Sequence, residues 1–470
     1  MVFSSLIFLY AFLPACLLFN LAAGSTKTKN YVLLAFSLFF YAWGEPLWVI
    51  LMILTGIFIY WTGINIDRYR GRQRSRFYLV LAIIGALSSL AIFKYLGFAV
   101  ENLNALTGLS LHVPKFSLPI GISFYTFQTL TYAIDLYRGE TKVQKSAANF
   151  LLYEALFPQL IAGPIVRYKD VADMINHRVM TYSGFSRGIS RFLIGLGKKV
   201  LIANYAGQLV EKTIGSGLAS LSGGEAWIGI LAYTIQIYFD FSGYSDMAIG
   251  LGRMFGFEFL DNFNYPYTAT SITDFWRRWH ISLSTFFRDY VYIPMGGNRQ
   301  HQVRNMLVVW GLTGLWHGAS WNFILWGLYY FLLLFVEKKY FGPVLKKLPS
   351  FVGHAYTLLA VILGWVFFYF TDFGQLTRML LLMSGFSGQP AWSIQTGLLL
   401  QNNLLFFVVA AVASTPLAAR LVARLKTTGQ ITTYHPALSI LTMAVNVLLL
   451  FASTAALVGS TYNPFLYFRF

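Results

Sequence analysis

The chain has 470 residues, of which 57% are hydrophobic and only 11% charged, and its mean hydropathy is +0.59. Soluble domains are about 25% charged, so this composition excludes a soluble globular protein and indicates a polytopic membrane protein. Lysine and arginine number 35 against 18 acidic residues, which gives a net charge of +17. We interpret this excess as the basic loops of a membrane protein, because no nucleic-acid-binding motif accompanies it.

The sequence contains few residues or motifs that are typical of metal binding or redox chemistry. Cys16 is the only cysteine, which excludes an intramolecular disulfide and a thiolate metal cluster. Nothing resembles a phosphate-binding loop, a dinucleotide-binding turn, a nucleophile elbow or a zinc-binding HExxH helix. The sequence therefore predicts no metal site and no bound cofactor.

Apolar segments dominate the chain, and about 20 such residues are enough for a helix to cross a membrane. The candidate spans are 3–23, 30–44, 46–66, 77–99, 117–137, 147–166, 187–210, 226–256, 305–317, 320–336, 354–372, 393–418 and 438–459. We interpret 117–137 and 187–210 as candidates for re-entrant or interfacial helices. The sequence predicts an all-α membrane protein with roughly eleven transmembrane helices plus such shorter helices. The first segment lacks the features of a cleavable signal peptide, so we expect it to be retained.

The basic loops indicate an orientation. Residues 67–76 hold five arginines and join the third and fourth candidate spans. Loops rich in lysine and arginine stay on the cytoplasmic side, so we expect this loop there. Lys27 and Lys29, between the first two spans, then fall on the same side. The N-terminus is therefore predicted to be extracytoplasmic.

A first functional candidate is His280, within residues 271–292. Ser271 and Asp274 have the S-x-x-D spacing of a helix start. From there large side chains recur every three or four residues, as on one face of a helix: Trp276, His280, Leu283, Phe287 and Tyr290. We predict one helix with His280 on its apolar face. The alternative, an interfacial amphipathic helix whose arginines reach the membrane surface, stays open.

His317 is the second candidate, because it is the only charged or imidazole side chain between Arg304 and Glu337. An ionisable ring in so apolar a stretch is costly in a membrane and is functional by default. Its ordinary pKa near neutrality suits a general base. Small and aromatic residues surround it: Gly311, Gly314, Gly318, Trp310, Trp316 and Trp321. We expect the glycines to let helices approach closely. The alternative to a functional His317 is a core histidine whose hydrogen bonds are satisfied.

Two carboxylates, Asp240 and Asp246, lie inside an apolar segment. Six residues apart, they face different sides of a helix, so we do not expect a catalytic pair. Gly243 between them is expected to interrupt the helix. The carboxylates either serve function, as a polar wall of a substrate channel or as a partner that supports a histidine, or they fix the bundle through hydrogen bonds between helices. Both interpretations stay open. The Gly163-Pro164 break beside Arg167 is similarly either a substrate entrance or a span ending at a basic interface.

Five long motifs, in this order along the chain, point to one family. They are LPIGISFYTFQTLTYAIDLYRG at 118–139, FPQLIAGPIVRY at 157–168, QIYFDFSGYSDMAIGLGRMFGF at 236–257, FWRRWHISLS at 275–284 and GLWHGASWNF at 314–323. Together they make the chain resemble the membrane-bound O-acyltransferase (MBOAT) superfamily, most closely its alginate O-acetyltransferase membrane subunits. The resemblance is densest over residues 1–335.

The resemblance implies a single transmembrane domain, 1–470, with a funnel or tunnel converging on His317. It implies an O-acyltransferase of the bacterial inner membrane that moves an acetyl group from a cytoplasmic thioester, acetyl-CoA, for O-acetylation of a secreted polysaccharide such as alginate or cellulose. His317 would be the base and His280 a positioning or polarising residue. The residues predicted to line the substrate channel are Asp240, Asp246, Trp276, Trp316, Trp321 and Arg167.

The resemblance also implies partners. A separate periplasmic acetyltransferase of the SGNH class and a polysaccharide synthesis complex are expected, and the immediate acceptor is either that partner or the glycan. Two alternatives stay open. One is transfer of D-alanine from a carrier protein to teichoic acid, and the other is a transporter or scaffold without covalent chemistry.

Overall fold

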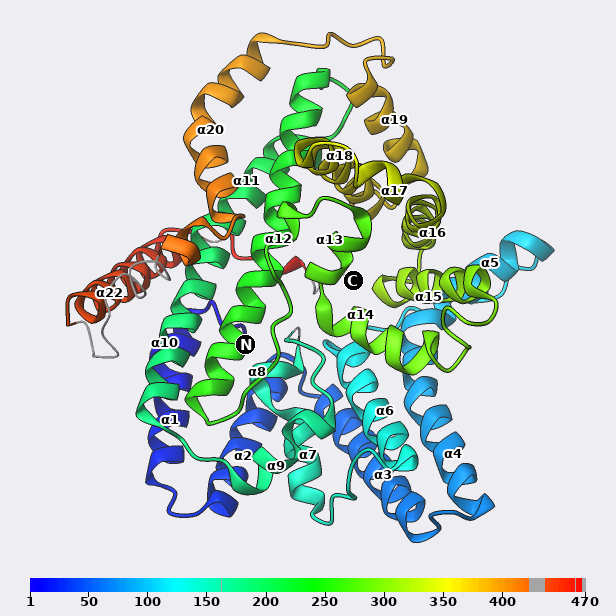
Figure 1. The fold of residues 1–470 in the computed structure, drawn as a ribbon, viewed down its shortest axis with the longest axis vertical. Coiled ribbons are helices and arrows are strands. Elements are labelled where there is room, and N and C mark those ends of the chain that lie inside the picture. The colour runs from blue at the N-terminus through cyan, green and yellow to red at the C-terminus, as the bar shows by residue number, and fades with distance from the viewer. Residues whose placement is uncertain (162, 422–435, 461, 467–470) are drawn as a thin grey trace. The chain divides into compact units, whose positions relative to one another are not determined.

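The computed structural model describes residues 1–161, 163–421, 436–460 and 462–466. Within these ranges the chain is helical and contains no β-strand, which confirms the all-α prediction (Figure 1). The chain forms two compact units, Met1–Leu193 with Tyr244–Leu260, and Ile194–Gly243 with Asp261–Phe470. The boundary runs through helices α10 (Tyr182–Gly197) and α12 (Gly223–Met254). The single-domain prediction stays a prediction.

The first unit contains most of the N-terminal helices. They are α1 (Leu13–Ala22), α2 (Thr26–Gly44), α3 (Trp48–Arg68), α4 (Gln73–Leu90), α5 (Leu96–Thr107), α6 (Ile122–Arg138), α7 (Ala147–Ala155), α8 (Phe157–Leu160) and α9 (Tyr168–His177). A π-helical turn, Ala91–Tyr95, joins α4 to α5. Figure 1 shows α3, α4 and α6 side by side.

Glycines set the spacing of the helices in this unit. A Cβ added at Gly85 of α4 would lie 2.1 Å from the Phe58 ring of α3. A Cβ at Gly63 of α3 would lie 2.7 Å from the Tyr132 ring of α6. Small residues at such crossings let helices pack closely where lipid offers no hydrophobic drive.

The second unit contains the C-terminal helices. They are α11 (Asn204–Lys212), α13 (Ile272–Arg278), α14 (Ile281–Phe287), α15 (Gln302–His317), α16 (Trp321–Val336), α17 (Gly342–Leu345), α18 (Ser350–Tyr369), α19 (Phe373–Ser384), α20 (Ile394–Ala413) and α22 (Pro436–Val458). Most of α12 also belongs to it.

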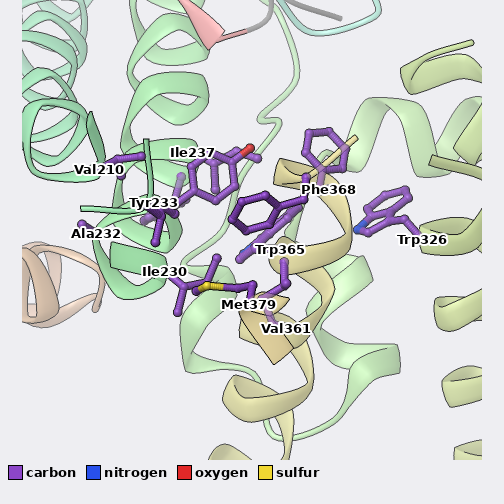
Figure 2. Packing of buried hydrophobic residues seen from close by; sticks show 14 of the residues in the cluster. Val210, Ile230, Ala232, Tyr233, Ile237, Trp326, Val361, Trp365, Phe368 and Met379 are labelled. Atoms are coloured by element: carbon purple, nitrogen blue, oxygen red, sulfur yellow. The ribbon is translucent and has the colours of Figure 1, made fainter. Parts of the chain in front are cut away.

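The core of the second unit combines large aromatic side chains with aliphatic ones, as Figure 2 shows. Trp365 and Phe368 of α18 meet Trp326 of α16, with the Trp326 and Phe368 ring centroids 5.3 Å apart. Tyr233 of α12 and Met379 of α19 lie in the same buried cluster. Aromatic rings combine a large buried area with preferred edge-to-face contacts, which fixes their relative orientation.

Helices α15 and α16 approach each other at their backbones. A Cβ added at Gly314 would lie 2.3 Å from the carbonyl oxygen of Phe323, and one at Gly327 would lie 2.3 Å from that of Trp310. The expected close approach is therefore confirmed at Gly314. Gly311 differs, because a Cβ there meets nothing within 4 Å.

Five helical segments in the described residues are long and apolar enough to cross a membrane. They are Trp48–Arg68, Gln73–Thr107, Ser350–Tyr369, Ile394–Ala413 and Ser439–Val458. A membrane-spanning helical protein is therefore supported, and roughly eleven spans remain a sequence prediction. The first predicted span corresponds to a shorter apolar helix, Phe8–Ala22.

The prediction of one helix through 271–292 was wrong. The predicted position of the helix start was correct, since Ser271 Oγ accepts a hydrogen bond from Asp274 N at 3.0 Å. However, α13 ends at Arg278, His280 has the left-handed conformation (φ 44°, ψ 55°), and α14 begins at Ile281. The Ile281 N–H donates to the carbonyl of Asn262 at 3.0 Å. This tertiary hydrogen bond replaces the bond that a continuous helix would make.

The expected interruption at Gly243 was also wrong, because α12 runs unbroken from Gly223 to Met254. Gly243 instead makes room for a neighbouring backbone. A Cβ there would lie 2.8 Å from the carbonyl oxygen of Gly195 and 3.1 Å from Lys199 N. The glycine therefore serves close packing.

The two glycines of α15 provide a matched test. Gly314→Ala should lower the Tm of the purified protein and reduce its activity, because the added methyl group would collide with the α16 backbone. Overpacking of this kind costs about 1–3 kcal/mol. Gly311→Ala, three residues earlier in the same helix, should leave Tm unchanged or raise it, because alanine favours helix. Equal effects of the two substitutions on Tm would contradict this packing.

Candidate active site

His317 lies at the end of α15, inside the aromatic core of the second unit. It is the last residue of the helix, and Gly318 after it is extended. The side chain is 4% exposed. Its ring centroid lies 4.9 Å from that of Trp316, 5.0 Å from Trp326 and 5.2 Å from Phe368. The close approach of α15 and α16 at Gly314 brings His317 against Trp326 of α16.

His280 lies at the break between α13 and α14, and its side chain is 1% exposed. Its Nδ1 is 3.2 Å from Asn262 Oδ1. The same oxygen accepts hydrogen bonds from the Ser282 backbone N–H at 3.1 Å and from Ser282 Oγ at 2.9 Å. Because the backbone donor identifies this Asn262 atom as a carbonyl oxygen, the His280 contact requires the proton on Nδ1. The Nε2 atom is then the basic nitrogen of a neutral ring.

His280 belongs to residues 261–301, which lie outside the helical segments that are long and apolar enough to cross a membrane. Burial lowers the pKa of the His280 ring to about 3, because the charged form loses its hydration. The ring is therefore neutral at physiological pH. A neutral imidazole suits positioning or hydrogen bonding to a substrate.

Trp316 brings the two histidines into one site. Its ring centroid is 5.7 Å from that of His280 and 4.9 Å from that of His317. Phe241 of α12 packs edge-on against His280 at 4.7 Å. Two imidazoles that are 37 positions apart in the sequence thus share one indole neighbour, in an environment that water scarcely reaches.

The other predicted tryptophans differ in burial. Trp276 of α13 is 8% exposed, and its ring centroid lies 4.9 Å from Tyr330 and 5.6 Å from Trp326. It belongs to the same aromatic cluster as His317. Trp321 begins α16 and is half exposed. Its predicted place along a channel stays a prediction.

Glu337 is a buried residue of this site that sequence reasoning missed. Its carboxylate accepts hydrogen bonds from the backbone N–H groups of Ile272 at 2.7 Å and Thr273 at 2.9 Å. These are the first residues of α13, where a negative charge complements the free N–H groups and the helix dipole. Glu337, the residue after α16, thereby holds the start of the helix that leads to His280. The neighbouring Lys338 and Lys339 hid this role, since they make the segment look solvated.

Asp240 is engaged in a buried ion pair, with its Oδ1 2.7 Å from Lys199 Nζ. Its other oxygen accepts a hydrogen bond from Leu466 N at 2.8 Å, and Lys199 also donates to the Pro464 carbonyl. These contacts tie the C-terminal segment to α12, one residue before the Phe241 that touches His280. They favour the bundle-fixing interpretation of Asp240.

Asp246 and Arg167 belong to the first unit, whereas His280 and His317 belong to the second. Asp246 pairs with Arg191 at 2.9 Å, which joins α12 to α10. Arg167 makes two hydrogen bonds to Asp170, at 2.9 and 3.0 Å, at the start of α9. Both contacts support local structure, and a role along a substrate channel stays a prediction for each residue.

The arrangement around His317 and His280 suits proton transfer. No group of three or more potential metal ligands occurs among the residues that the structure describes. The site combines two imidazoles with aromatic walls, which exclude water and strengthen electrostatic interactions inside. A buried imidazole that shares an indole neighbour with a second one can accept a proton from a hydroxyl, while the second ring orients or polarises a reactant.

Comparison with known proteins identifies the class. The family model of MBOAT, the membrane-bound O-acyltransferases, matches residues 2–374. This stretch includes both histidines, Trp316 and Glu337. The chain therefore belongs to the membrane-bound O-acyltransferase family and is an O-acyltransferase.

The names of individual relatives specify different acyl groups and acceptors. A probable alginate O-acetylase, AlgI, of Azotobacter vinelandii is 40% identical over the full length of both chains. A peptidoglycan O-acetyltransferase of Helicobacter pylori is 35% identical over 83% of this chain and 80% of its own. A teichoic acid D-alanyltransferase of Bacillus subtilis is 29% identical over 65% of this chain and 78% of its own.

Two substitutions at His280 test the role of its backbone and its ring. His280→Asn should retain more acyl transfer than His280→Ala, because asparagine keeps a polar group and tolerates the left-handed conformation that alanine resists. The strain in the alanine variant should cost about 1–2 kcal/mol and lower its Tm. Both variants should be measured for Tm and transfer rate. An asparagine variant as inactive as the alanine variant would argue against positioning.

Proposed function

We propose that this protein transfers an acetyl group from a cytoplasmic thioester donor, acetyl-CoA, for O-acetylation of a secreted polysaccharide. The observation that carries this proposal is the pair of buried histidines around Trp316, in a chain of the membrane-bound O-acyltransferase family. The site contains the proton acceptor that such a reaction needs, and it lies in a water-poor environment that disfavours hydrolysis of the thioester.

The relatives favour acetyl over D-alanyl transfer. The alginate O-acetylase matches the whole chain at 40% identity, whereas the D-alanyltransferase matches 65% of it at 29%. For the acceptor we propose a secreted glycan of the alginate or cellulose kind. The peptidoglycan O-acetyltransferase at 35% identity supports acetylation of an extracytoplasmic glycan as the shared activity.

The proposed reaction needs one proton acceptor and one site for the oxyanion. His317 takes the proton of the acceptor hydroxyl as that oxygen attacks the thioester carbonyl carbon. The carbon–oxygen bond forms, negative charge gathers on the carbonyl oxygen, and the carbon–sulfur bond then breaks. The thiolate leaves and takes up the proton from His317. The products are an acetyl ester and the free thiol of coenzyme A.

His280 is proposed to act by hydrogen bonding. Its Nδ1 is committed to Asn262, so its basic Nε2 is the atom that can accept a hydrogen bond from a donor, an acceptor or a polar group of the site. Trp276, Trp316 and Trp321 are proposed to border the path to His317. Asp240, Asp246 and Arg167 are proposed to maintain the helices that carry them, through their ion pairs and hydrogen bonds.

The membrane setting completes the proposal. We place the protein in the bacterial inner membrane, with roughly eleven spans around a funnel that leads to His317. The N-terminus is extracytoplasmic and the arginine-rich loop 67–76 is cytoplasmic. Acetyl-CoA then enters from the cytoplasm, and the acceptor is reached from the other side.

A separate periplasmic partner of the SGNH class is proposed to complete transfer to the sugar, within a polysaccharide synthesis complex. The immediate acceptor of the acetyl group is then a hydroxyl of that partner or of the glycan. Either acceptor requires the same proton removal by His317.

His317→Ala tests the proposal. The variant should lose acetylation of the secreted polymer, because a general base contributes on the order of 10²–10⁴-fold in rate. Its abundance in the membrane should stay near that of the wild type, because removing a buried polar ring removes a desolvation cost. The measurements are the acetyl content of the secreted polymer and an immunoblot of the membrane fraction.

His177→Ala is the matched control, since His177 is exposed at the end of α9. It should acetylate the polymer as the wild type does. Wild-type acetylation in the His317 variant would overturn the catalytic assignment and favour a transporter or scaffold. Transfer of D-alanine, with no transfer of acetyl, would favour the D-alanyltransferase alternative.

A further inference from the structure

A cavity in the first unit lies away from the histidines in sequence and has no role in the reaction described above. Its volume is about 530 Å³. The loop that joins α3 to α4 forms one wall, and the last turn of α6 forms the other, with Leu136 and Tyr137. Three of the five arginines of segment 67–76 line it: Arg70, Arg72 and Arg76.

Arg70 is already neutralised. Its guanidinium lies 3.0 Å from Asp67 Oδ1, and it also donates to the Leu136 carbonyl at 3.5 Å. Arg70 therefore joins the loop to the end of α6 and forms part of the cavity wall.

Arg72 and Arg76 carry positive charges that no neighbouring carboxylate in the described part of the chain compensates. Among the residues that the structure describes, no carboxylate pairs with either guanidinium. Glu140, which follows α6, is paired with Lys169 at 2.5 Å. Two arginines without a carboxylate partner among the described residues thus line the cavity.

The backbone adds to this charge. Helix α4 begins at Gln73, which lines the cavity, and Arg72 at its N-cap makes no side-chain capping bond. The N–H groups of a first helical turn carry partial positive charge. Guanidinium groups and such N–H groups are the partners that phosphate oxygens prefer.

We propose that this cavity binds a phosphate group through Arg72 and Arg76. Two sources offer that chemistry at a cytoplasmic membrane surface. One is the headgroup of an anionic phospholipid. The other is the phosphates of coenzyme A, and this second source rests on the proposed function, in which acetyl-CoA is the donor.

A general excess of positive charge in cytoplasmic loops explains arginine in this loop without a binding site. That explanation treats all five arginines alike. The cavity distinguishes them, because Arg74 does not line it and instead lies over the Tyr69 ring at 5.6 Å. Arg74 is therefore the matched control for charge alone.

The test uses the full-length protein, purified in an uncharged detergent, and measures Kd from ligand-dependent shifts in Tm. The probes are phosphatidylglycerol, with diacylglycerol as its phosphate-free counterpart, and coenzyme A, with pantetheine as its phosphate-free counterpart. The proteins are wild type, the double variant Arg72→Gln/Arg76→Gln, and Arg74→Gln. All three arginines are exposed, so glutamine should preserve the fold.

At least one phosphate-bearing probe should bind the wild type, and its phosphate-free counterpart should not. The double variant should weaken this binding by about tenfold or more, because two charge-assisted hydrogen-bonding groups are lost. Arg74→Gln should weaken it by no more than about twofold, since one screened surface charge is removed. Selective loss of phosphatidylglycerol binding identifies a lipid site, and selective loss of coenzyme A binding identifies a donor site.

Three results would overturn the proposal. They are the absence of binding to the wild type, equal binding of the phosphate-free counterparts, and equal losses in the Arg74 variant and the double variant. None of them depends on catalysis, because binding is measured without turnover. If His317→Ala left acetylation intact, the proposed function would fail while a phospholipid site could still be demonstrated.

Discussion

The site depends on the contact between the backbones of α15 and α16. Glycine at 314 and at 327 removes the side chains that would hold these helices apart, so each helix meets a carbonyl group of the other. This contact places His317, at the end of α15, against Trp326 of α16. Where lipid provides little drive for helix association, such close packing supplies the dispersion energy that holds the helices together.

A second constraint acts on the backbone at His280. Asn262 accepts hydrogen bonds from Ser282 and from the His280 ring, and its carbonyl accepts one from Ile281. Glu337 fixes the start of the preceding helix. The His280 ring is held by a hydrogen bond to Asn262 and packs against Phe241 and Trp316. The His317 ring packs against Trp316, Trp326 and Phe368.

The general architecture could be predicted from the sequence because hydrophobicity and glycine spacing are local signals. The helical fold, the buried His317 and the close contact at Gly314 all followed from them. The break at His280 could not be predicted, because apolar residues keep a helical spacing on both sides of it. At the break the Ile281 N–H donates to the carbonyl of Asn262, which lies nineteen positions earlier and has no signature in the local pattern.

The roles of two other residues, Glu337 and Gly243, could not be predicted from the sequence. Glu337 stands beside two lysines, a pattern typical of a solvated surface, yet its carboxylate is buried against the first turn of α13. Gly243 looked like a helix breaker, yet it allows a neighbouring backbone to approach a continuous α12. In both cases a partner distant in the sequence decides the role. Local propensity cannot reveal such partners.

The central claim is that His280 and His317 act on the same reacting groups within one site. A double-mutant cycle on the acetyl-transfer rate tests it most directly, using wild type, His280→Asn, His317→Ala and the double variant. If the rings cooperate in one step, the double variant should be no slower than His317→Ala alone, because effects within a catalytic unit are not additive. Rate losses that multiply in the double variant would contradict a shared site.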